Sequence, residues 1–566
     1  MSGLQRQSIM ATQRAALLAG GAALALAAAV AAGHAAAPTQ ARPVAKALTL
    51  QEATACKALT GRTFGDTRVE RVEIVSAGQK GGRNLFGSSR AIVPFCRVHA
   101  VGSSGPGSSI RIEVLLPATW NGKLLGVGGG GLSGGLSGST GALMRELARG
   151  YAGVANDAGH TDAKKAAWGI GSSARIEDFG YRANHVAALA GKAIASAYYA
   201  RPVERSYFSG CSNGGRDALM LAQRFPDDYD GIVAGAPAIN WTGLMATAQV
   251  NYRLYKQTPG AEKLPAKLSL IRSAVIAKCD RLDGVADDVL ENPLACRFDP
   301  AELQCKAGET SDKCLTPAEV QVARAIYRGP RTQDGVQVLQ GFPLGSEHGK
   351  SIIPIVGWAP WFFNGPKAGV RLSDDFYSGL VTQNLDWDPR TFDLERDYRL
   401  AKTRVGAALD ALDPDLRPFA ARGGKLILFQ GWEDPAIPAG STLDYYAAAR
   451  DRLGPASQGS VRLFMAPGMA HCSLGHGPDT FDIIPVIDAW VSANTAPDTI
   501  LAAKHDGQLG LLFGKPGDIV RTRPLCPWPA TAHYKGSGST DDAANFTCRV
   551  EPGQGARLEH PSPRGA

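Results

Sequence analysis

The chain has 566 residues, of which 44% are hydrophobic, so it can bury a large core and is long for a single compact domain. Its net charge is +8 at pH 7, with Lys and Arg scattered along the chain rather than gathered in a basic block. A polyanion site concentrates positive charge on one segment, so we expect no nucleic acid partner.

The N-terminus has the pattern of an export signal. Arg6 and Arg14 precede an apolar run at 15–32, and small residues at 34–37 offer a cleavage site. The alternative is an uncleaved membrane anchor, but alanine dominates the run and inserts weakly into a bilayer. We therefore expect residues 1–37 to be a cleaved signal and the mature protein to be secreted or periplasmic, without stable membrane association.

Strand-like and helix-like segments alternate from about residue 50 to residue 237. The expected strands here are 110–116, 123–127, 206–209 and 232–234, and a helix is expected from Gly214. This alternation indicates a mostly parallel sheet with helices on both faces.

The pattern changes after Trp241, where the chain becomes irregular and rich in Pro, Gly and aromatic residues. Strand patterns return at 425–430 and 461–465. The sequence therefore predicts one α/β domain interrupted by a long insertion. We assign 38–239 and 399–566 to the α/β domain and 240–398 to the insertion.

Ten cysteines follow the signal, and none has the paired spacing of zinc ligands. In an oxidising compartment an even set of this kind forms disulfides. The sequence alone does not fix the pairing, but neighbours along the chain suggest Cys56–Cys96, Cys279–Cys296, Cys305–Cys314 and Cys526–Cys548. Cys211 and Cys472 are then left for each other.

A G-x-S-x-G pattern at 210–214 stands between an expected strand and an expected helix. In such a motif a tight turn exposes a serine in a strained conformation, and the flanking glycines remove Cβ atoms that would clash. The pattern indicates Ser212 as a nucleophile. The alternative is a glycine-rich turn with a buried serine.

A nucleophilic serine needs an orienting acid and a base, which follow it in the order Asp, His in α/β hydrolases. Asp434 follows the strand expected at 425–430, and His471 lies on the loop after the strand expected at 461–465. Glu433 and His476 are the rivals for these two roles.

The two leftover cysteines support the same site. A disulfide between Cys211 and Cys472 requires Cα atoms within about 7 Å, which brings Ser212 and His471 together. The rival view, in which Cys211 is itself a thiol nucleophile, fits poorly with export and an even number of cysteines.

An oxyanion hole needs two backbone N–H donors. One is expected from Asn213, and the other from the glycine-rich loop after the strand at 123–127, at Gly129 or Gly130. A flexible glycine linker is the alternative reading of this loop. The loop lacks the Lys of a nucleotide cradle, so we expect no organic cofactor.

The insertion carries closely spaced carboxylates at Asp280, Asp283 and Asp287. Oxygen ligands of this kind suit a hard cation, Ca²⁺ before Mg²⁺ or zinc, although the spacing is not that of an EF-hand. A solvated acidic loop is the alternative. The flanking Cys279 and Cys296 would staple the loop, which favours a structural metal.

Several motifs together resemble the tannase and feruloyl esterase family, which includes hydrolases of mono(2-hydroxyethyl) terephthalate. They are Trp-Asn-Gly at 120–122, Asn-Asp-Ala-Gly-His at 156–160, Phe-Gly-Tyr-Arg-Ala-Asn-His at 179–185, Gly-Cys-Ser-Asn-Gly-Gly-Arg at 210–216, Phe-Pro at 225–226, Asp-Gly at 230–231 and Pro-Gly-Met-Ala-His-Cys at 467–472. The resemblance covers most of the chain after the signal.

This resemblance implies an α/β-hydrolase fold with a large lid domain, and Ser212, His471 and Asp434 as nucleophile, base and orienting acid. It also implies the disulfide between Cys211 and Cys472. The lid would bind Ca²⁺ through the carboxylates of Asp280, Asp283 and Asp287 and the carbonyls of Val285 and Val289.

The expected function is hydrolysis of small aromatic esters of the feruloyl esterase or tannase type, through an acyl-enzyme. Trp358, Trp361 and Phe362 are candidates for stacking on the acyl group, or are ordinary lid core. Arg371 is a candidate for meeting a substrate carboxylate, as in the terephthalate branch. That branch is the alternative function, and a non-catalytic, calcium-stabilised secreted binding protein is a more distant one. The oligomeric state is left open.

Overall fold

The computed structural model describes residues 46–84, 87–132, 134–136, 140–161, 164–309, 311–348, 356–363, 368–507 and 517–551. The expected export signal at 1–37 lies outside these residues. None of the described helices is long and apolar enough to cross a membrane.

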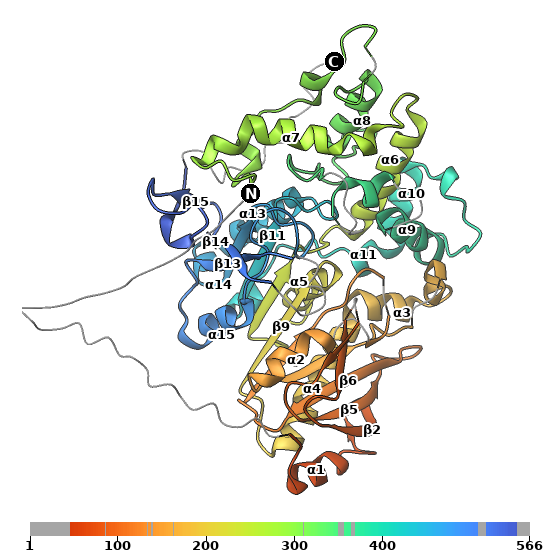
Figure 1. Cartoon of the computed structure of the whole chain (residues 1–566). Helices are drawn as coiled ribbons and strands as arrows, with labels where there is room; N and C mark the ends of the chain where they lie inside the picture. The colour runs from red at the N-terminus through yellow and green to blue at the C-terminus, as the bar shows by residue number, and fades with distance from the viewer. Residues whose placement is uncertain are drawn as a thin grey trace, which may run out of the picture. The chain divides into compact units, whose positions relative to one another are not determined.

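A central sheet organises the fold (Figure 1). In the described part of the chain it has ten strands, in the order β1-β2-β5-β6-β8-β7-β9-β10-β11-β12. Their bounds are β1 Thr63–Phe64, β2 Thr67–Val75, β5 Phe95–Gly102, β6 Ile110–Pro117, β7 Lys123–Val127, β8 Ala152–Asn156, β9 Arg205–Cys211, β10 Gly231–Gly235, β11 Lys425–Gly431 and β12 Val461–Ala466. The strands from β8 to β12 pair in parallel, while β1, β2, β5 and β6 join the sheet antiparallel.

Helices cover both faces of the parallel strands, as the sequence predicts. On β11, Leu426 and Leu428 pack with α5 (Asn213–Arg224) and α13 (Ala439–Leu453). The intervening Ile427 packs on the opposite face with α2 (Thr140–Ala148) and α15 (Ile483–Ala493). Alternate side chains of one strand thus enter different cores, which is why the middle of β11, residues 426–429, is apolar. α4 (Ala183–Tyr199) and α1 (Leu50–Lys57) enclose a third cluster beside the antiparallel strands.

The chain between β10 and β11, drawn from yellow-green to cyan in Figure 1, adds no strand to the central sheet within the described residues. Its helices are α6 Trp241–Gln257, α7 Leu268–Cys279, α8 Pro317–Arg328, α9 Ala368–Asp375, α10 Leu394–Ala401, α11 Ala407–Leu409 and α12 Arg417–Ala421. α7 and α8 share a hydrophobic cluster that includes Ile271 and Ile326. We call residues 240–398 the lid, as expected from the sequence, although irregular and helical chain continues from 399 up to β11.

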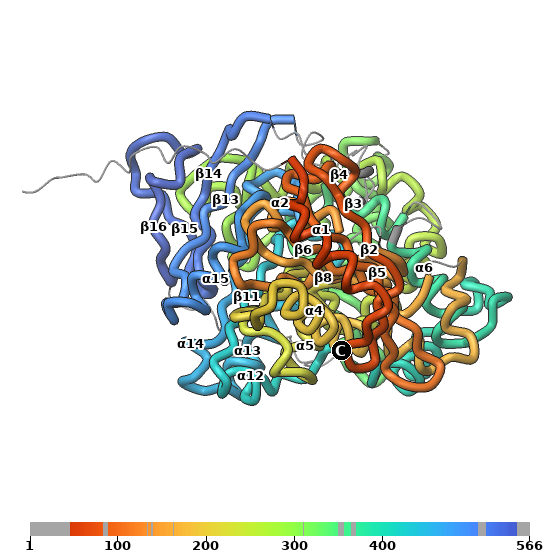
Figure 2. Tube along the Cα trace, turned by 90° about the horizontal axis from the view of Figure 1, so that it is seen from below, coloured from red at the N-terminus to blue at the C-terminus, as the bar shows by residue number. Residues whose placement is uncertain are grey.

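The chain after α15 adds strand pairs that the sequence did not reveal. β13 (Ile500–His505) pairs with β14 (Ile519–Leu525), and β15 (Thr531–Tyr534) pairs with β16 (Phe546–Arg549). Figure 2 shows them side by side, and β14 contacts both β15 and β16. The remaining short elements are β3 Lys80–Asn84, β4 Gly87–Arg90, α3 Ser173–Glu177 and α14 Ser457–Ser460.

All ten cysteines lie within the described residues and form five disulfides. The pairs are Cys56–Cys96, Cys211–Cys472, Cys279–Cys296, Cys305–Cys314 and Cys526–Cys548, which confirms the pairing suggested by the sequence.

Candidate active site

Ser212 occupies the turn between β9 and α5. Its backbone has φ 65° and ψ −123°, a strained conformation for a residue with a side chain, and the turn presents the hydroxyl above the sheet. Glycines make the turn possible. A Cβ on Gly210 would lie 2.4 Å from the carbonyl oxygen of Gly214, and one on Gly128 would lie 2.5 Å from the Cα of Gly214.

A hydrogen-bonded chain leads from Ser212 to Asp434 through His471. The Ser212 Oγ lies 2.9 Å from His471 Nε2, and His471 Nδ1 lies 2.9 Å from Asp434 Oδ2. A carboxylate can only accept, so Nδ1 carries the proton and Nε2 faces the serine as an acceptor. This is the arrangement in which a histidine can remove the serine proton.

The acid of this chain is held firmly. Asp434 is 0% exposed and follows β11, while His471 follows β12. Asp434 Oδ1 accepts hydrogen bonds from the N–H groups of Ala436 (2.8 Å) and Ile437 (2.9 Å), and Gln430 donates to Asp434 Oδ2. These donors compensate the buried charge and fix the orientation of the carboxylate.

Glu433 and His476, the alternative acid and base considered from the sequence, are not part of this hydrogen-bonded chain. Glu433 Oε2 is 2.7 Å from His476 Nδ1, so the two rival residues contact each other. The rival nucleophile is also occupied, because Cys211 is bonded to Cys472 with Cα atoms 6.0 Å apart.

A buried polar network joins Asn213 to the glycine-rich loop after β7. Arg216 is fully buried, and its guanidinium donates to the side-chain oxygens of Asn213 (2.8 Å) and Asp217 (2.8 Å). The N–H of Gly129 donates to the Asp217 carboxylate. Burial raises the pKa of Asp217 to about 6, against the opposing effects of Arg216 and the hydrogen-bond donors. Sequence reasoning assigned no role to Asp217, although Arg216 stands in the family motif.

The N–H groups predicted to bind an oxyanion, those of Asn213 and the glycine-rich loop, have different surroundings. Asn213 is the first residue of α5, so its N–H is at the helix N-terminus beside Ser212. The N–H of Gly129 donates to Asp217, and Gly130 is the next residue of the same loop.

A narrow apolar cavity adjoins Ser212 and His471. Its volume is about 30 Å³, and it is lined by Ser212, His471 and residues of the lid. The aromatic side chains that line it are Trp241, Phe342, Trp361 and Phe362. The Trp361 ring meets the His471 ring edge-on, with centroids 5.8 Å apart.

Two of the predicted pocket residues lie outside this cavity. Trp358 is 0% exposed, because its ring packs in the lid core beside α8. Its indole N–H donates to Ser346 Oγ. Arg371 has 65% of its side chain exposed on α9, 3.9 Å from Asp375, so it projects into solvent rather than toward Ser212. The predicted contact of these residues with substrate is not supported.

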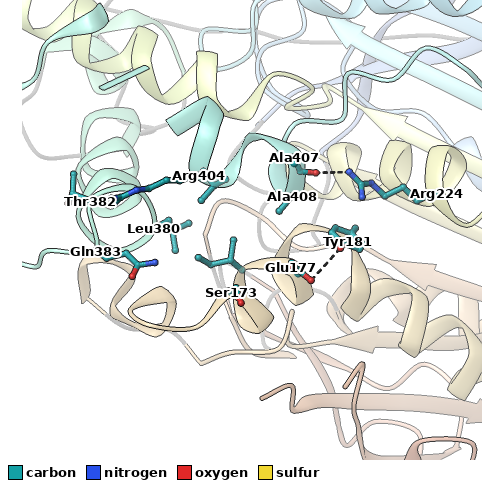
Figure 3. A pocket seen from close by; sticks show the side chains of 12 residues that line it. Ser173, Glu177, Tyr181, Arg224, Leu380, Thr382, Gln383, Arg404, Ala407 and Ala408 are labelled. Atoms are coloured by element: carbon teal, nitrogen blue, oxygen red, sulfur yellow. Dashed lines mark hydrogen bonds between the residues drawn. The ribbon is translucent and has the colours of Figure 1, made fainter. Parts of the chain in front are cut away.

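Two larger cavities do not include Ser212 or His471 in their lining. One, of about 620 Å³, is lined by residues including Ser173, Tyr181, Arg224 and Arg404 (Figure 3). Another, of about 770 Å³, borders Phe342 and Trp432. Neither is lined by Ser212, Asp434 or His471, so chemistry rather than size identifies the candidate site.

The acidic loop of the lid gathers partly buried carboxylates. Asp280 accepts from the N–H of Asp287 at 3.3 Å, and Asp283 accepts from the N–H of Val285 at 2.9 Å. Burial raises the pKa of Asp283 to about 6 and that of Glu291 to about 8, and neighbouring carboxylates add to both shifts. Crowded oxygen donors that resist ionisation fit a hard cation, which would offset their charge.

One of the predicted cation ligands also has a protein partner. The Asp287 carboxylate pairs with Arg523 and lies 3.6 Å from Arg521, both on β14. These arginines offset part of the negative charge of the loop. Val285 and Val289, whose carbonyls were predicted ligands, are buried in the same loop.

Comparisons with known proteins agree on one family. Residues 96–549 match the family described as tannase and feruloyl esterase. An uncharacterised esterase of Xanthomonas campestris pv. campestris is 35% identical, covering 83% of this chain and 86% of the relative. The mono(2-hydroxyethyl) terephthalate hydrolase of Piscinibacter sakaiensis is 34% identical, covering 82% and 86%. The crystal structure of feruloyl esterase B from Aspergillus oryzae superposes with a TM-score of 0.78 at 26% identity, covering 88% of this chain and 100% of that one.

Proposed function

Because this chain belongs to the tannase and feruloyl esterase family of carboxylic ester hydrolases, we propose that it is a secreted serine esterase acting on esters of aromatic, phenolic acids. The observation that carries the proposal is the chain of 2.9 Å contacts from Ser212 through His471 to Asp434, beside an aromatic-lined cavity. Secretion is supported by the five disulfides, which persist in oxidising compartments.

The proposed reaction proceeds through an acyl-enzyme. His471 Nε2 takes the proton of Ser212 Oγ as that oxygen attacks the ester carbonyl. The N–H of Asn213 and an N–H of the Gly129–Gly130 region stabilise the developing oxyanion. His471 then gives the proton to the leaving alcohol, and water, deprotonated by His471, releases the acid.

The cavity lining supports an aromatic acyl group. Trp361 and Phe362 offer ring faces and edges against which a flat acyl group can pack. The present volume of about 30 Å³ holds about one water, so these lid side chains must shift to admit the substrate. The described lining residues include no Arg or Lys, which favours feruloyl and galloyl esters over a terephthalate carrying a free carboxylate.

Mono(2-hydroxyethyl) terephthalate remains the second candidate substrate, because a relative at 34% identity is a hydrolase of that compound. The more distant alternative, a binding protein without activity, is disfavoured by the assembled hydrogen-bonded chain at Ser212.

We also propose that the lid binds a structural Ca²⁺. Asp280, Asp283 and Asp287 would supply carboxylate oxygens, and Val285 and Val289 would supply carbonyls. The buried carboxylates with raised pKa values support this assignment. When bound, the cation would offset the charge of the loop and would take no part in ester cleavage.

A panel assay tests the proposed function. The purified mature protein is assayed on methyl ferulate, methyl gallate, mono(2-hydroxyethyl) terephthalate and p-nitrophenyl acetate, with Ser212→Ala as control. Preference for one aromatic ester, lost in the variant, would support the proposal and identify the branch. Activity on p-nitrophenyl acetate alone would refute the aromatic pocket, and no activity on any ester would favour the binding protein.

A further inference from the structure

His348, Glu433 and His476 form a cluster at the junction of the lid and the catalytic domain. His348 belongs to the lid, Glu433 directly precedes Asp434, and His476 follows His471 by five positions. Glu433 Oε2 lies 2.7 Å from His476 Nδ1 and 3.0 Å from His348 Nε2. The three ligand atoms lie within 4.8 Å of one another, so residues from three separate chain segments point at one small space.

The buried histidine lacks an ordinary partner in this space. His348 is 3% exposed, and its Nε2 finds no partner with hydrogen-bond geometry among the described residues, although Glu433 Oε2 is close. A buried polar nitrogen without a hydrogen bond costs free energy. A cation bound between His348 and Glu433 would give this nitrogen a well-directed partner.

The charged groups around the cluster are arranged about Glu433. The imidazoles of His348 and His476 stack with centroids 4.6 Å apart, so both rings present their edges to the same carboxylate oxygen. Arg272 Nη2 lies 3.3 Å from Glu433 Oε1, and Lys504 also lies in the field of this carboxylate. Arg272 and Lys504 pair in turn with Asp288 and Asp479.

The donor set is that of a divalent transition metal. Two imidazoles and a carboxylate hold zinc in many proteins, with metal–ligand distances of about 2.0–2.2 Å and ligand atoms about 3.4 Å apart. The distances of 2.7 and 3.0 Å at Glu433 Oε2 need only a slight opening to reach that spacing. Arg272 fixes the other carboxylate oxygen, as outer partners of metal ligands do.

Access and local packing also suit a bound ion. His476 has 33% of its side chain exposed, which gives the ion a way in and leaves room for a water ligand. The N–H of His476 is tied to the carbonyl of Gly468 at 2.7 Å, and a Cβ on Gly357 would lie 2.7 Å from the Cβ of His348. Both histidines are thus held in place by backbone packing.

We propose that His348, Glu433 and His476 bind a divalent transition metal ion, zinc in the first instance, that fastens the lid to the loop carrying Asp434. The site is separate from the acidic loop, which offers only oxygen ligands and suits Ca²⁺. The ion is structural, since its ligands do not contact Ser212 or His471 in the contacts described above.

The chain offers a matched control for the test. His185 Nδ1 lies 2.8 Å from Asp228 Oδ2, with 30% of the histidine side chain exposed and 5% of the carboxylate. The corresponding values for His476 and Glu433 are 2.7 Å, 33% and 4%. The two pairs differ in that the His185 pair stacks on Phe225 rather than on a second histidine.

The experiment uses the full mature protein, stripped with 1,10-phenanthroline while Ca²⁺ is kept in excess. Zinc is titrated by calorimetry, and Co²⁺ is added as a probe whose visible absorption reports nitrogen coordination. We expect one equivalent of zinc to bind and to raise the Tm, as any ligand of the native state does. His476→Gln and His348→Gln should each weaken zinc binding by at least about tenfold, whereas His185→Gln should bind as the wild type does.

No zinc binding by the stripped wild type would overturn the proposal. So would binding that is equal in His476→Gln, or equally lost in His185→Gln. If His348→Gln fails to fold, His476→Gln still decides the question, because its side chain is partly exposed. Esterase activity is not the readout, so failure here leaves the proposed function standing.

Discussion

Cys211 and Cys472 are bonded to each other, and they directly precede Ser212 and directly follow His471. The bond closes a separation of 261 residues. It also reaches across the sheet, since β10 and β11 lie between β9, which ends at Cys211, and β12, which precedes His471. Ser212 and His471 are therefore held close together by a covalent bond between their neighbours.

Replacing Cys211 and Cys472 together by Ser should lower kcat by about 10- to 100-fold, because small displacements of reacting groups are costly to catalysis. The matched control replaces Cys56 and Cys96 by Ser, removing a disulfide with a separation of 40 residues far from the site. Both variants should lose stability in urea unfolding, whereas only the first should lose kcat. Equal kcat values in the two variants would contradict a positioning role.

Asp434→Asn should lower kcat by about 10³- to 10⁴-fold with little change in folding, because the amide cannot hold the proton on His471 Nδ1. Glu433→Gln tests whether the neighbouring acid has the same effect on kcat, since Glu433 contacts His476 rather than His471. We expect its kcat to fall far less than that of Asp434→Asn. Steady-state kinetics on the preferred ester measures both, and the reverse order would exchange the roles of the two residues.

Gly128→Ala should displace the glycine-rich loop and lower kcat by about 10²-fold, as loss of an oxyanion donor does. The reason is steric, because the new Cβ would lie 2.5 Å from the Cα of Gly214. The neighbouring Gly129→Ala is the control, since nothing lies within 4 Å of its Cβ. Kinetics and circular dichroism of both variants should show one impaired and one near-normal enzyme. Equal activity would argue against the loop's proximity to the oxyanion.

Asp488→Asn should lower the free energy of unfolding by about 1.5–3 kcal/mol near neutral pH, through lost charge-assisted hydrogen bonds. Asp488 on α15 accepts from Lys123 (2.5 Å), Tyr207 (2.5 Å) and Tyr151 (2.9 Å). Burial opposes its charge, but these donors prevail and hold the pKa of Asp488 below 3.8.

The sign of the pH dependence follows from that shift. A carboxyl whose pKa is lower in the folded protein binds its proton more readily when unfolded, so the stabilisation is present above pH 3.8 and is lost as the pH falls through the folded value. Urea unfolding at several pH values should show wild type and Asp488→Asn converging in acid. A constant difference would show that Asp488 acts through packing alone.

Chelation of Ca²⁺ with EGTA should lower the Tm of the wild type, and re-addition of Ca²⁺ should restore it, because a cation bound only to the native state stabilises it. Asp283→Asn should have a smaller response to Ca²⁺, since one carboxylate ligand is lost. Differential scanning calorimetry checks both. A Tm that ignores Ca²⁺ would show that Arg521 and Arg523 suffice to balance the acidic loop.

The local sequence patterns predicted parallel strands of the central sheet well. The strand expected at 123–127 is β7 at the same bounds, and the one expected at 425–430 is β11 with one residue added. The middle of each strand is apolar because both faces are covered, and each strand ends at a Gly-rich or acidic loop. The contacts among Ser212, His471 and Asp434 were predictable, because these residues follow such strands in a fixed chain order.

Contacts made through tertiary packing were not predictable. Trp358 and Trp361 are three residues apart and equally aromatic, yet one fills the lid core and the other lines the cavity. The cluster of His348, Glu433 and His476 has no sequence spacing to reveal it, because its ligands come from three distant segments. Asp217 likewise gains its role only from Arg216 and Gly129 in three dimensions.

The position of the lid between β10 and β11 has a consequence for biosynthesis. When a ribosome has translated β10, the nascent chain already contains Ser212, but Asp434 and His471 still lie almost 200 residues or more ahead. Strand β11 can join the sheet only after the whole lid has been translated, and Cys472 is later still. A polypeptide that ends before β11 therefore holds Ser212 without Asp434 and His471, and the hydrogen-bonded chain of the candidate site cannot form in it.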